Sequence, residues 1–397
     1  MNFFKLYFDN SLEKLSDIFF SKNKFGELTV FYPSGKINKY KGNFEGYKAD
    51  IKLKNYRIFY KLFKKGSVGF AESYMDGDFI SSNLSNLLLF AQQNELEYIK
   101  QKKAKWFYDF VIKLRHYLNQ NTKAGSKKNI SIHYDLGNNF YECWLDQSMT
   151  YSSALFSTNI NDLHAAQQNK FIGIAEPLQL NENSKLLEIG CGWGGFSAFV
   201  AKKYGTKVKA ITISKQQYDF ASEKIWKEGL NEKVEIAMCD YRDIKENYSK
   251  IVSIEMFEAV GKKYWQSFFQ KIKNSLTLNG LATMQIITID DDKANYYQNN
   301  PDFIQQYIFP GGILPSKNQL HEITKLIGLE LTEYKSFNNS YAKTLDLWNN
   351  KFQNSWNQIS KQGFPLRFKR MWEYYLSYCE VGFITKSTDV SHFLLKF

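Results

Sequence analysis

A glycine-rich segment directly after an apolar stretch most constrains how this chain of 397 residues can fold. The apolar residues 185–189 predict a buried strand, and Gly190, Gly192 and Gly194 follow at alternate positions before an expected helix from Gly195. Glycine permits a tight turn and a close approach of the backbone to a ligand. The N-terminus of the helix adds free N–H groups that can bind a carboxylate. The segment therefore predicts a ligand-binding turn between a strand and a helix.

Strands and helices alternate beyond this turn, which predicts a parallel sheet covered on both faces. Further strands are expected over residues 208–213, 234–238, 251–254, 281–287 and 329–334, and helices over 215–228, 264–276, 344–359 and 366–381. The expected fold class is α/β, with a doubly wound, Rossmann-like domain over residues 131–397.

The first third of the chain has a different character and is expected to form a smaller α+β domain over residues 1–118. A polar stretch with Gly and Ser, residues 119–130, predicts a linker. Residues 1–130 carry 23 Lys and Arg against 12 Asp and Glu, so they hold +11 of the net charge of +12. A basic surface attracts the phosphates of lipid or of nucleic acid. A basic face that is merely soluble is the alternative.

The location of the protein is also constrained by composition. No stretch reaches the roughly 18 apolar residues that span a bilayer, and the N-terminus lacks the features of a secretory signal. We expect a cytoplasmic protein that associates peripherally with the inner face of the membrane. The four cysteines have no metal or CxxC spacing, so neither a metal site nor a disulfide framework is expected. A homodimer stays open.

The glycine spacing is G-x-G-x-G, which differs from the G-x-G-x-x-G of dinucleotide sites, and no Walker lysine follows. In this strand order the turn predicts a site for S-adenosylmethionine (SAM), with a structural turn as the alternative. Glu188 ends the first strand at this site. The second strand ends without an acid for the ribose hydroxyls, which leaves Thr212 and Gln217 as polar groups. Asp240 and Tyr241 follow the third strand, where an adenine would be recognised, although Tyr241 is also compatible with a core position.

Further motifs carry a resemblance to a known family. They lie at residues 66–77, 133–137, 149–152, 188–194, 256–261, 307–316 and 341–348. With them the chain resembles the cyclopropane-fatty-acyl-phospholipid synthase family, which includes the mycolic acid cyclopropane synthases, over nearly its whole length. The resemblance implies a class I SAM-dependent methyltransferase that modifies double bonds of unsaturated phospholipid acyl chains. The positive charge of residues 1–130 predicts that it binds an anionic membrane surface. A small-molecule or nucleic-acid methyltransferase and a non-catalytic lipid-binding relative are the alternatives, but no nucleic-acid partner is expected.

The resemblance also implies roles for individual positions. The positions that would line the cofactor are Tyr151, Ser152, Gly190, Gly192, Gly194, Thr212, Gln217 and Tyr241. The family holds a bicarbonate ion as general base, and the matching positions are Glu258, Tyr341, the backbone of Ile287, Ser153 and Gln285.

Two of these positions depart from the family pattern. Ser153 stands where the family has Cys, and Gln285 stands where the family has His. Both side chains can still donate hydrogen bonds to an anion, but Gln cannot carry the positive charge of a His. The product therefore stays open between a cyclopropane and a methyl-branched or methylene chain. Glu258 is expected to be catalytic, with a helix N-terminal acid as the alternative, and Glu255 is a candidate cofactor contact.

Overall fold

The computed structural model describes residues 13–14, 16–17, 20–95 and 136–396, which form two compact units. The smaller unit contains the described residues up to Glu95 together with Ile359–Val381. The larger unit contains residues 136–358 and 382–396. Residues 359–381, expected from the sequence in the larger domain, thus belong with the N-terminal unit. The expected linker at 119–130 lies outside the described residues.

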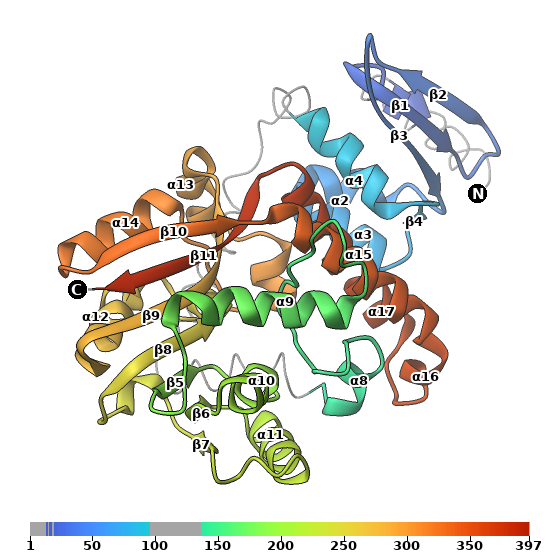
Figure 1. Cartoon of the computed structure of the whole chain (residues 1–397). Coiled ribbons are helices and arrows are strands. Elements are labelled where there is room, and N and C mark those ends of the chain that lie inside the picture. Colours follow the sequence, from blue (N-terminus) through green and yellow to red (C-terminus); the bar gives the residue numbers. More distant parts are fainter. Residues whose placement is uncertain (1–12, 15, 18–19, 96–135, 397) are drawn as a thin grey trace. The chain divides into compact units, whose positions relative to one another are not determined.

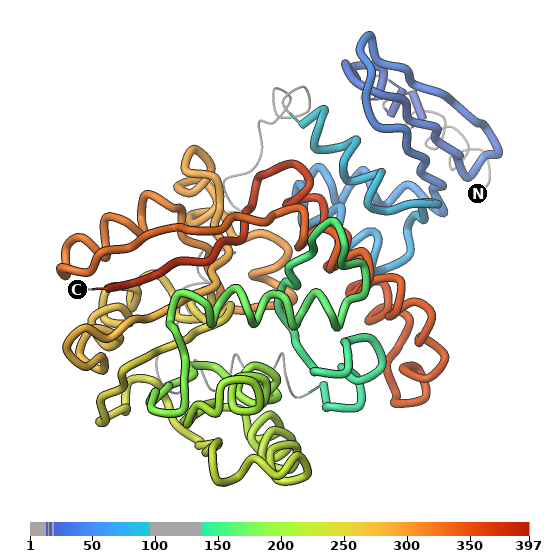
Figure 2. The backbone as a smooth tube through the Cα atoms, in the orientation of Figure 1, coloured from blue at the N-terminus to red at the C-terminus, as the bar shows by residue number. Residues whose placement is uncertain are grey.

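The larger unit is built on a seven-stranded sheet with the order β10-β11-β9-β8-β5-β6-β7 (Figure 1). Five parallel strands come first in the chain: β5 (Lys185–Ile189), β6 (Lys207–Thr212), β7 (Val234–Met238), β8 (Tyr248–Ile254) and β9 (Leu276–Ile289). The last strand, β11 (Thr388–Lys396), runs antiparallel between β9 and β10 (Glu330–Ser336), as the tube in Figure 2 shows. The strand order reverses at β5, which confirms the expected doubly wound class and puts a ligand-binding crevice at its carboxyl end.

Helices cover both faces of this sheet. The helices that pack on one face are α9 (Leu163–Ala175), α10 (Gly195–Tyr204) and α11 (Lys215–Lys227). The other face is covered by α12 (Trp265–Ser275) and α14 (Lys317–Leu326). The remaining helices are α8 (Asn138–Glu142), α13 (Asp291–Asn299), α15 (Asn338–Asn354), α16 (Trp356–Ser360) and α17 (Leu366–Ile384), with short turns η1 (Glu176–Leu178), η2 (Tyr241–Asp243), η3 (Phe257–Ala259), η4 (Lys262–Tyr264) and η5 (Ile304–Ile308).

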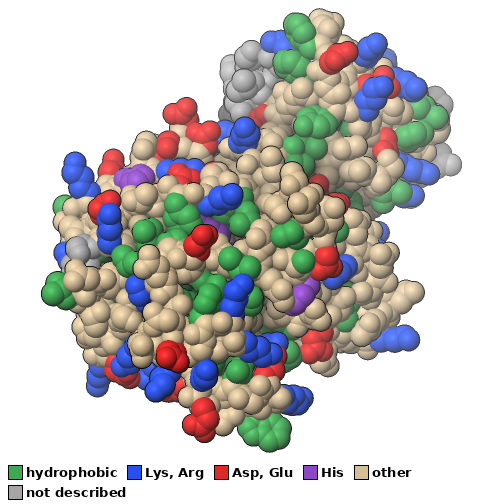
Figure 3. Space-filling view, in the orientation of Figure 1, with side chains coloured by type: hydrophobic (Ala, Val, Ile, Leu, Met, Phe, Trp, Pro, Cys, Tyr) green, Lys and Arg blue, Asp and Glu red, His purple; other side chains and the backbone are tan. Residues whose placement is uncertain are grey.

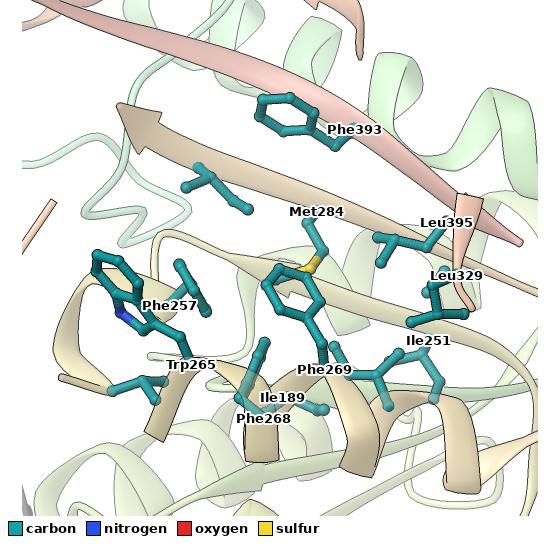
Figure 4. Close-up of a cluster of buried hydrophobic side chains, with 14 of the residues drawn as sticks. Ile189, Ile251, Phe257, Trp265, Phe268, Phe269, Met284, Leu329, Phe393 and Leu395 are labelled. Carbon is teal, nitrogen blue, oxygen red and sulfur yellow. The ribbon is translucent and has the colours of Figure 1, made fainter. Parts of the chain in front are cut away.

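Two hydrophobic cores follow from the alternation of side chains along the strands. On β5, Leu186 packs into the core under α9, α10 and α11, whereas Leu187 and Ile189 pack into the core under α12. Figure 4 shows the second core, where Phe268 and Phe269 lie among side chains of the sheet. Each such buried side chain contributes about 1.5–3 kcal/mol relative to exposure. The two cores hold the sheet rigid. The C-terminal ends of its parallel strands, called the carboxyl edge below, therefore have fixed positions.

The smaller unit combines a four-stranded sheet of order β2-β1-β3-β4 with helices. Its elements are β1 (Phe25–Phe31), β2 (Ile37–Lys41), β3 (Phe44–Leu53), α2 (Arg57–Lys65), α3 (Ser67–Met75), β4 (Phe79–Ile80) and α4 (Leu84–Gln93). Polar contacts tie α17 to this unit: the Tyr74 hydroxyl donates to Glu373 at 3.1 Å, and Arg367 Nε donates to Asp76 at 2.8 Å. Within the described ranges, no helix is long and apolar enough to cross a membrane.

Candidate active site

The turn between β5 and α10 has the backbone that its glycines allow. Gly190, Gly192 and Gly194 have φ angles of 82°, 54° and 80°, a region that residues with a Cβ rarely adopt. A Cβ on Gly190 would lie 2.7 Å from the Cγ atom of Met256, so no side chain fits there. A Cβ on Gly192 would meet no atom within 4 Å. Gly192 thus faces open space, which fits a ligand seated on the turn.

The segment before α9 lies against the start of α10. A Cβ on Gly195 would come within 2.8 Å of the Ser148 carbonyl oxygen. In this segment the Tyr151 ring packs 5.4 Å from the Trp348 ring, centroid to centroid. The buried Ser152 hydroxyl accepts a hydrogen bond from Lys170 Nζ at 2.7 Å. The structure therefore places the segment that contains Tyr151 and Ser152 against the helix that follows the glycine turn, and it adds Lys170, which sequence reasoning missed.

The other expected cofactor residues lie along the carboxyl edge formed by β5, β6 and β7. At the end of β6, the Thr212 hydroxyl donates to Gln217 Oε1 at 2.8 Å. At the end of β5, the Glu188 carboxyl accepts from the Ser197 hydroxyl, and burial raises the pKa of Glu188 to about 8. Glu188 is thus a largely neutral acid at pH 7 that faces α10.

Asp240 and Tyr241 follow β7, as expected, and both already have protein partners. Arg242 donates to the Asp240 carboxylate through Nε at 2.8 Å and through its Nη2 atom at 2.6 Å. The Tyr241 ring meets Phe268 edge-on, with centroids 5.1 Å apart, and is partly buried against the core under α12. Arg242 thus fixes the orientation of Asp240 at this edge.

Three hydrogen-bond donors from distant parts of the chain converge on the carboxylate of Glu255. The Ser153 backbone N–H donates to Oε1 at 2.8 Å, and the Gln285 amide donates to the same oxygen at 2.6 Å. The Tyr341 hydroxyl donates to Oε2 at 2.6 Å. These donors favour the ionised form, whereas burial, the largest effect, raises the pKa of Glu255.

The orientation of Gln285 is fixed from β11. The register of the antiparallel pair places His392 opposite Gln285, and His392 Nε2 lies 2.9 Å from Gln285 Oε1. Burial lowers the pKa of His392 to about 3, so the ring is neutral at physiological pH and can donate from Nε2. With its oxygen held by His392, Gln285 must present its NH₂ group to Glu255. His392 is a second contributor that the sequence did not reveal.

Glu258 lies in η3, three residues after Glu255. Its Oε1 accepts the backbone N–H of Ile287 at 2.5 Å, while its buried Oε2 has no hydrogen-bond partner among the described residues. Burial and then the negative charge of Glu255 raise the pKa of Glu258 to about 8. Glu258 is therefore mainly protonated at neutral pH. The five residues expected around a base thus form two groups, one at each carboxyl.

The strand order, the glycine turn and the polar carboxyl edge together define a class I SAM-dependent methyltransferase. Residues 121–393 match the mycolic acid cyclopropane synthetase family, and the chain belongs to that family. It is thus a C-methyltransferase of the cyclopropane-synthase type, as expected from the sequence.

Individual relatives agree with this assignment. The tuberculostearic acid methyltransferase UfaA1 of Mycobacterium tuberculosis is 32% identical over 343 residues, which cover 84% of this chain and 80% of the relative. The cyclopropane-fatty-acyl-phospholipid synthase of Escherichia coli K12 is 35% identical over 343 residues and 84% of each chain. The structure of the mycolic acid cyclopropane synthase CmaA1 with SAH and CTAB superimposes with a TM-score of 0.64 at 29% identity. It covers 68% of this chain and 98% of CmaA1.

Substitution of Gly192 tests the cofactor turn. We expect Gly192→Val to weaken SAM binding by about tenfold or more, a loss of about 1.4 kcal/mol, because the new side chain occupies the open space over the turn. Calorimetry with SAM measures the change. Gly229→Val is the matched control, since Gly229 also has a positive φ of 66° and open space around its Cβ position. Equal SAM affinities of the two variants would refute the assignment.

Glu258→Gln tests whether the protonated acid beside Glu255 contributes to the reaction. Gln preserves the acceptor for the Ile287 N–H but does not titrate, so we expect turnover to fall by about 10²-fold with SAM affinity within a few-fold. The pKa of the folded wild type is about 8 against an ordinary 4.5, so the wild type loses stability as pH rises through that interval. The Tm of the variant should therefore rise relative to wild type between those pH values. Wild-type turnover in the Glu258→Gln variant would show that Glu258 has only a structural role.

Proposed function

We propose that this protein transfers a methyl group from SAM to the double bond of an unsaturated acyl chain in a membrane phospholipid. The observation that carries this proposal is the pair of carboxyls, Glu255 and Glu258, beside the glycine turn. Methylation of an alkene leaves a carbocation on the chain, and a stable product forms only when a base removes a proton. Methylation of a nitrogen or oxygen lone pair does not pass through a carbocation.

The residues of the chain contribute positioning, electrostatics and a proton acceptor. SAM supplies an electrophilic methyl group. An alkene is a weak nucleophile, so the protein must hold the double bond in line with that group. The negative charge on Glu255 and the ring of Tyr341 can stabilise a nearby cation. Water must be kept from the cation, which would otherwise be trapped as an alcohol.

The functions of the relatives support an acyl-chain substrate but differ in product. The names of the two relatives describe a methyltransferase that makes tuberculostearic acid and a synthase that forms cyclopropane phospholipids. The departures at Ser153 and Gln285, and the contact of both with Glu255, favour a methyl-branched or methylene product for this chain. A base in a different position reaches a different proton of the same cation.

Lipid analysis of cells that express the protein tests the substrate and the product together. We expect unsaturated phospholipid chains to gain about 14 mass units, the mass of CH₂, because methyl transfer followed by proton loss adds one carbon and two hydrogens. With a methyl-deuterated SAM precursor, proton loss from the chain leaves three deuteriums, while ring closure leaves two and gives cyclopropyl NMR signals. A methylene formed from the added methyl keeps two and gives vinyl signals.

Cyclopropyl signals alone would contradict the methyl-branched or methylene product and favour ring closure. Unchanged lipids in expressing cells, alongside a purified protein that binds SAM, would contradict the proposed function.

The smaller unit offers a surface suited to an anionic bilayer. On α2, Tyr60 and Phe63 are 64% and 77% exposed, and exposed Lys64 lies on the same helix face at the i+4 position from Tyr60. On β2, Ile37 lies on the same exposed face as Lys39 and Lys41, because side chains two residues apart in a strand point the same way. Figure 3 shows hydrophobic and basic side chains next to one another on this unit. Aromatic rings that insert at the headgroup level beside lysines are typical of peripheral membrane binding.

Vesicle sedimentation tests this membrane contact. We expect binding to anionic vesicles to exceed binding to neutral ones and to weaken at high salt, since each basic residue contributes on the order of 1 kcal/mol and salt screens it. Phe63→Ser should reduce binding, because it removes an apolar side chain from the surface. Leu278→Ser is the control, since Leu278 is 83% exposed but lies on β9 in the other unit. Equal binding to neutral and anionic vesicles would contradict the proposal.

A further inference from the structure

The groups expected to hold a bicarbonate ion already bind a side chain of this protein. Ser153 contributes its backbone N–H, Gln285 its amide and Tyr341 its hydroxyl, and all three donate to Glu255. These three residues are buried, whereas Glu255 is half-buried. A bicarbonate ion would need the same donors and would lie next to a carboxylate of the same charge. The residues present therefore do not fit a separate bound anion.

The backbone holds Glu255 in a conformation that favours glycine. Its φ angle is 48°, and its N–H donates to the Gln285 carbonyl oxygen at 2.9 Å. A non-glycine residue in the left-handed region costs of order 1 kcal/mol or more and persists only where its surroundings compensate. Three hydrogen bonds to an ionised carboxylate, at 2.6–2.8 Å, are a sufficient compensation. The strained backbone therefore aims this carboxylate at its donors.

A buried lysine interacts with the carboxyl of Glu255. Lys170 is fully buried on α9, and burial lowers the pKa of Lys170 to about 7. The charge of Glu255 is the largest effect in the opposite direction. The neighbours Gln285 and His392 are neutral, and Glu258 is mainly protonated. Glu255 is thus the carboxyl of the network whose ionised form is favoured by its three donors and by Lys170.

We propose that the Glu255 carboxylate itself is the general base of the reaction, in place of the bicarbonate ion that the family uses. This inference rests on the proposed function. Ile189, the last residue before the glycine turn, pairs with Ser253 on the neighbouring strand β8. Glu255 follows Ser253 by two residues. The carboxylate is therefore next to the site where a methyl group is delivered.

The proposed step balances without any further reactant. The π electrons of the alkene form the new C–C bond, the S–CH₃ bond breaks, and its electrons stay on sulfur, which becomes a neutral thioether. A C–H bond of the resulting cation then gives its proton to Glu255, and its electrons form either a ring bond or a new double bond. Glu255 becomes a neutral acid, and release of that proton to solvent restores the starting state.

Turnover with and without bicarbonate tests the inference in the whole protein. The assay uses SAM and dioleoylphosphatidylglycerol vesicles in CO₂-free buffer, with sodium bicarbonate added or omitted. We expect wild-type kcat to be the same in both buffers. Glu255→Gly should lose about 10²- to 10⁴-fold in kcat, the range for loss of a general base. Added bicarbonate should restore part of it, because the deletion frees the three donors and relaxes the backbone.

Two further variants separate the role of the carboxylate from its bulk. Glu255→Gln should lose kcat equally without recovery in bicarbonate, because its side chain still fills the site but cannot accept the proton. Asn279→Gly is the matched control, since exposed Asn279 also has a positive φ, of 61°, and its kcat should equal that of wild type in both buffers. SAM affinity within a few-fold of wild type establishes that each variant is folded.

Binding of ¹³C-bicarbonate, followed by NMR, gives a readout that is independent of lipid turnover. We expect saturable binding to Glu255→Gly and none to wild type. A wild type that requires bicarbonate, a Glu255→Gly variant with wild-type kcat in CO₂-free buffer, or one that neither binds bicarbonate nor recovers with it would overturn the inference. A wild type that leaves the vesicle lipids unmethylated in both buffers would instead contradict the proposed function, and the binding experiment would still decide whether Glu255 occupies the anion site.

Discussion

The convergence of three donors on one carboxylate is the interaction on which the site depends. Ser153, Gln285 and Tyr341 come from the segment before α9, from β9 and from α15, and each donates to Glu255. An ionised carboxylate in a poorly solvated place is stable only when its oxygens are satisfied, so the positions of these elements are mutually constrained. The sheet makes this possible because the rigid cores on its two faces hold β8 and β9 side by side.

The sequence predicts the fold well where its apolar stretches are short and bounded. The strands expected at 185–189 and 234–238 coincide with β5 and β7. Such segments carry a local signal, since their residue types favour strands and turn residues end them. By contrast, β11 was not expected, because Ser391 and His392 interrupt its apolar pattern although both are fully buried in the structure. Pairing with β9 and β10 determines that strand, and pairing is a tertiary property.

The site was predictable only in part for the same reason. The glycine turn and Glu258 follow strands directly, so their place at the carboxyl edge can be inferred from the strand order. The contact of His392 with Gln285 depends on the register of an antiparallel pair that joins residues 107 positions apart. Lys170 resembles any helical lysine in the sequence, and only the packing of α9 buries it beneath Ser152. The attachment of residues 359–381 to the smaller unit likewise depends on contacts of α17 that have no local signature.

The discontinuous smaller unit constrains how this protein can be divided or recombined. Because α17 supplies buried residues such as Trp372 and Leu376, and polar contacts to α3 and its C-cap, the described residues 20–95 are not a self-sufficient module. A single cut between the two units leaves the N-terminal fragment without α17. The C-terminal fragment then carries α17 with its apolar side chains exposed. Gene fusions and domain exchanges between relatives must therefore carry the N-terminal segment and α17 together, as a matched pair inherited from one parent.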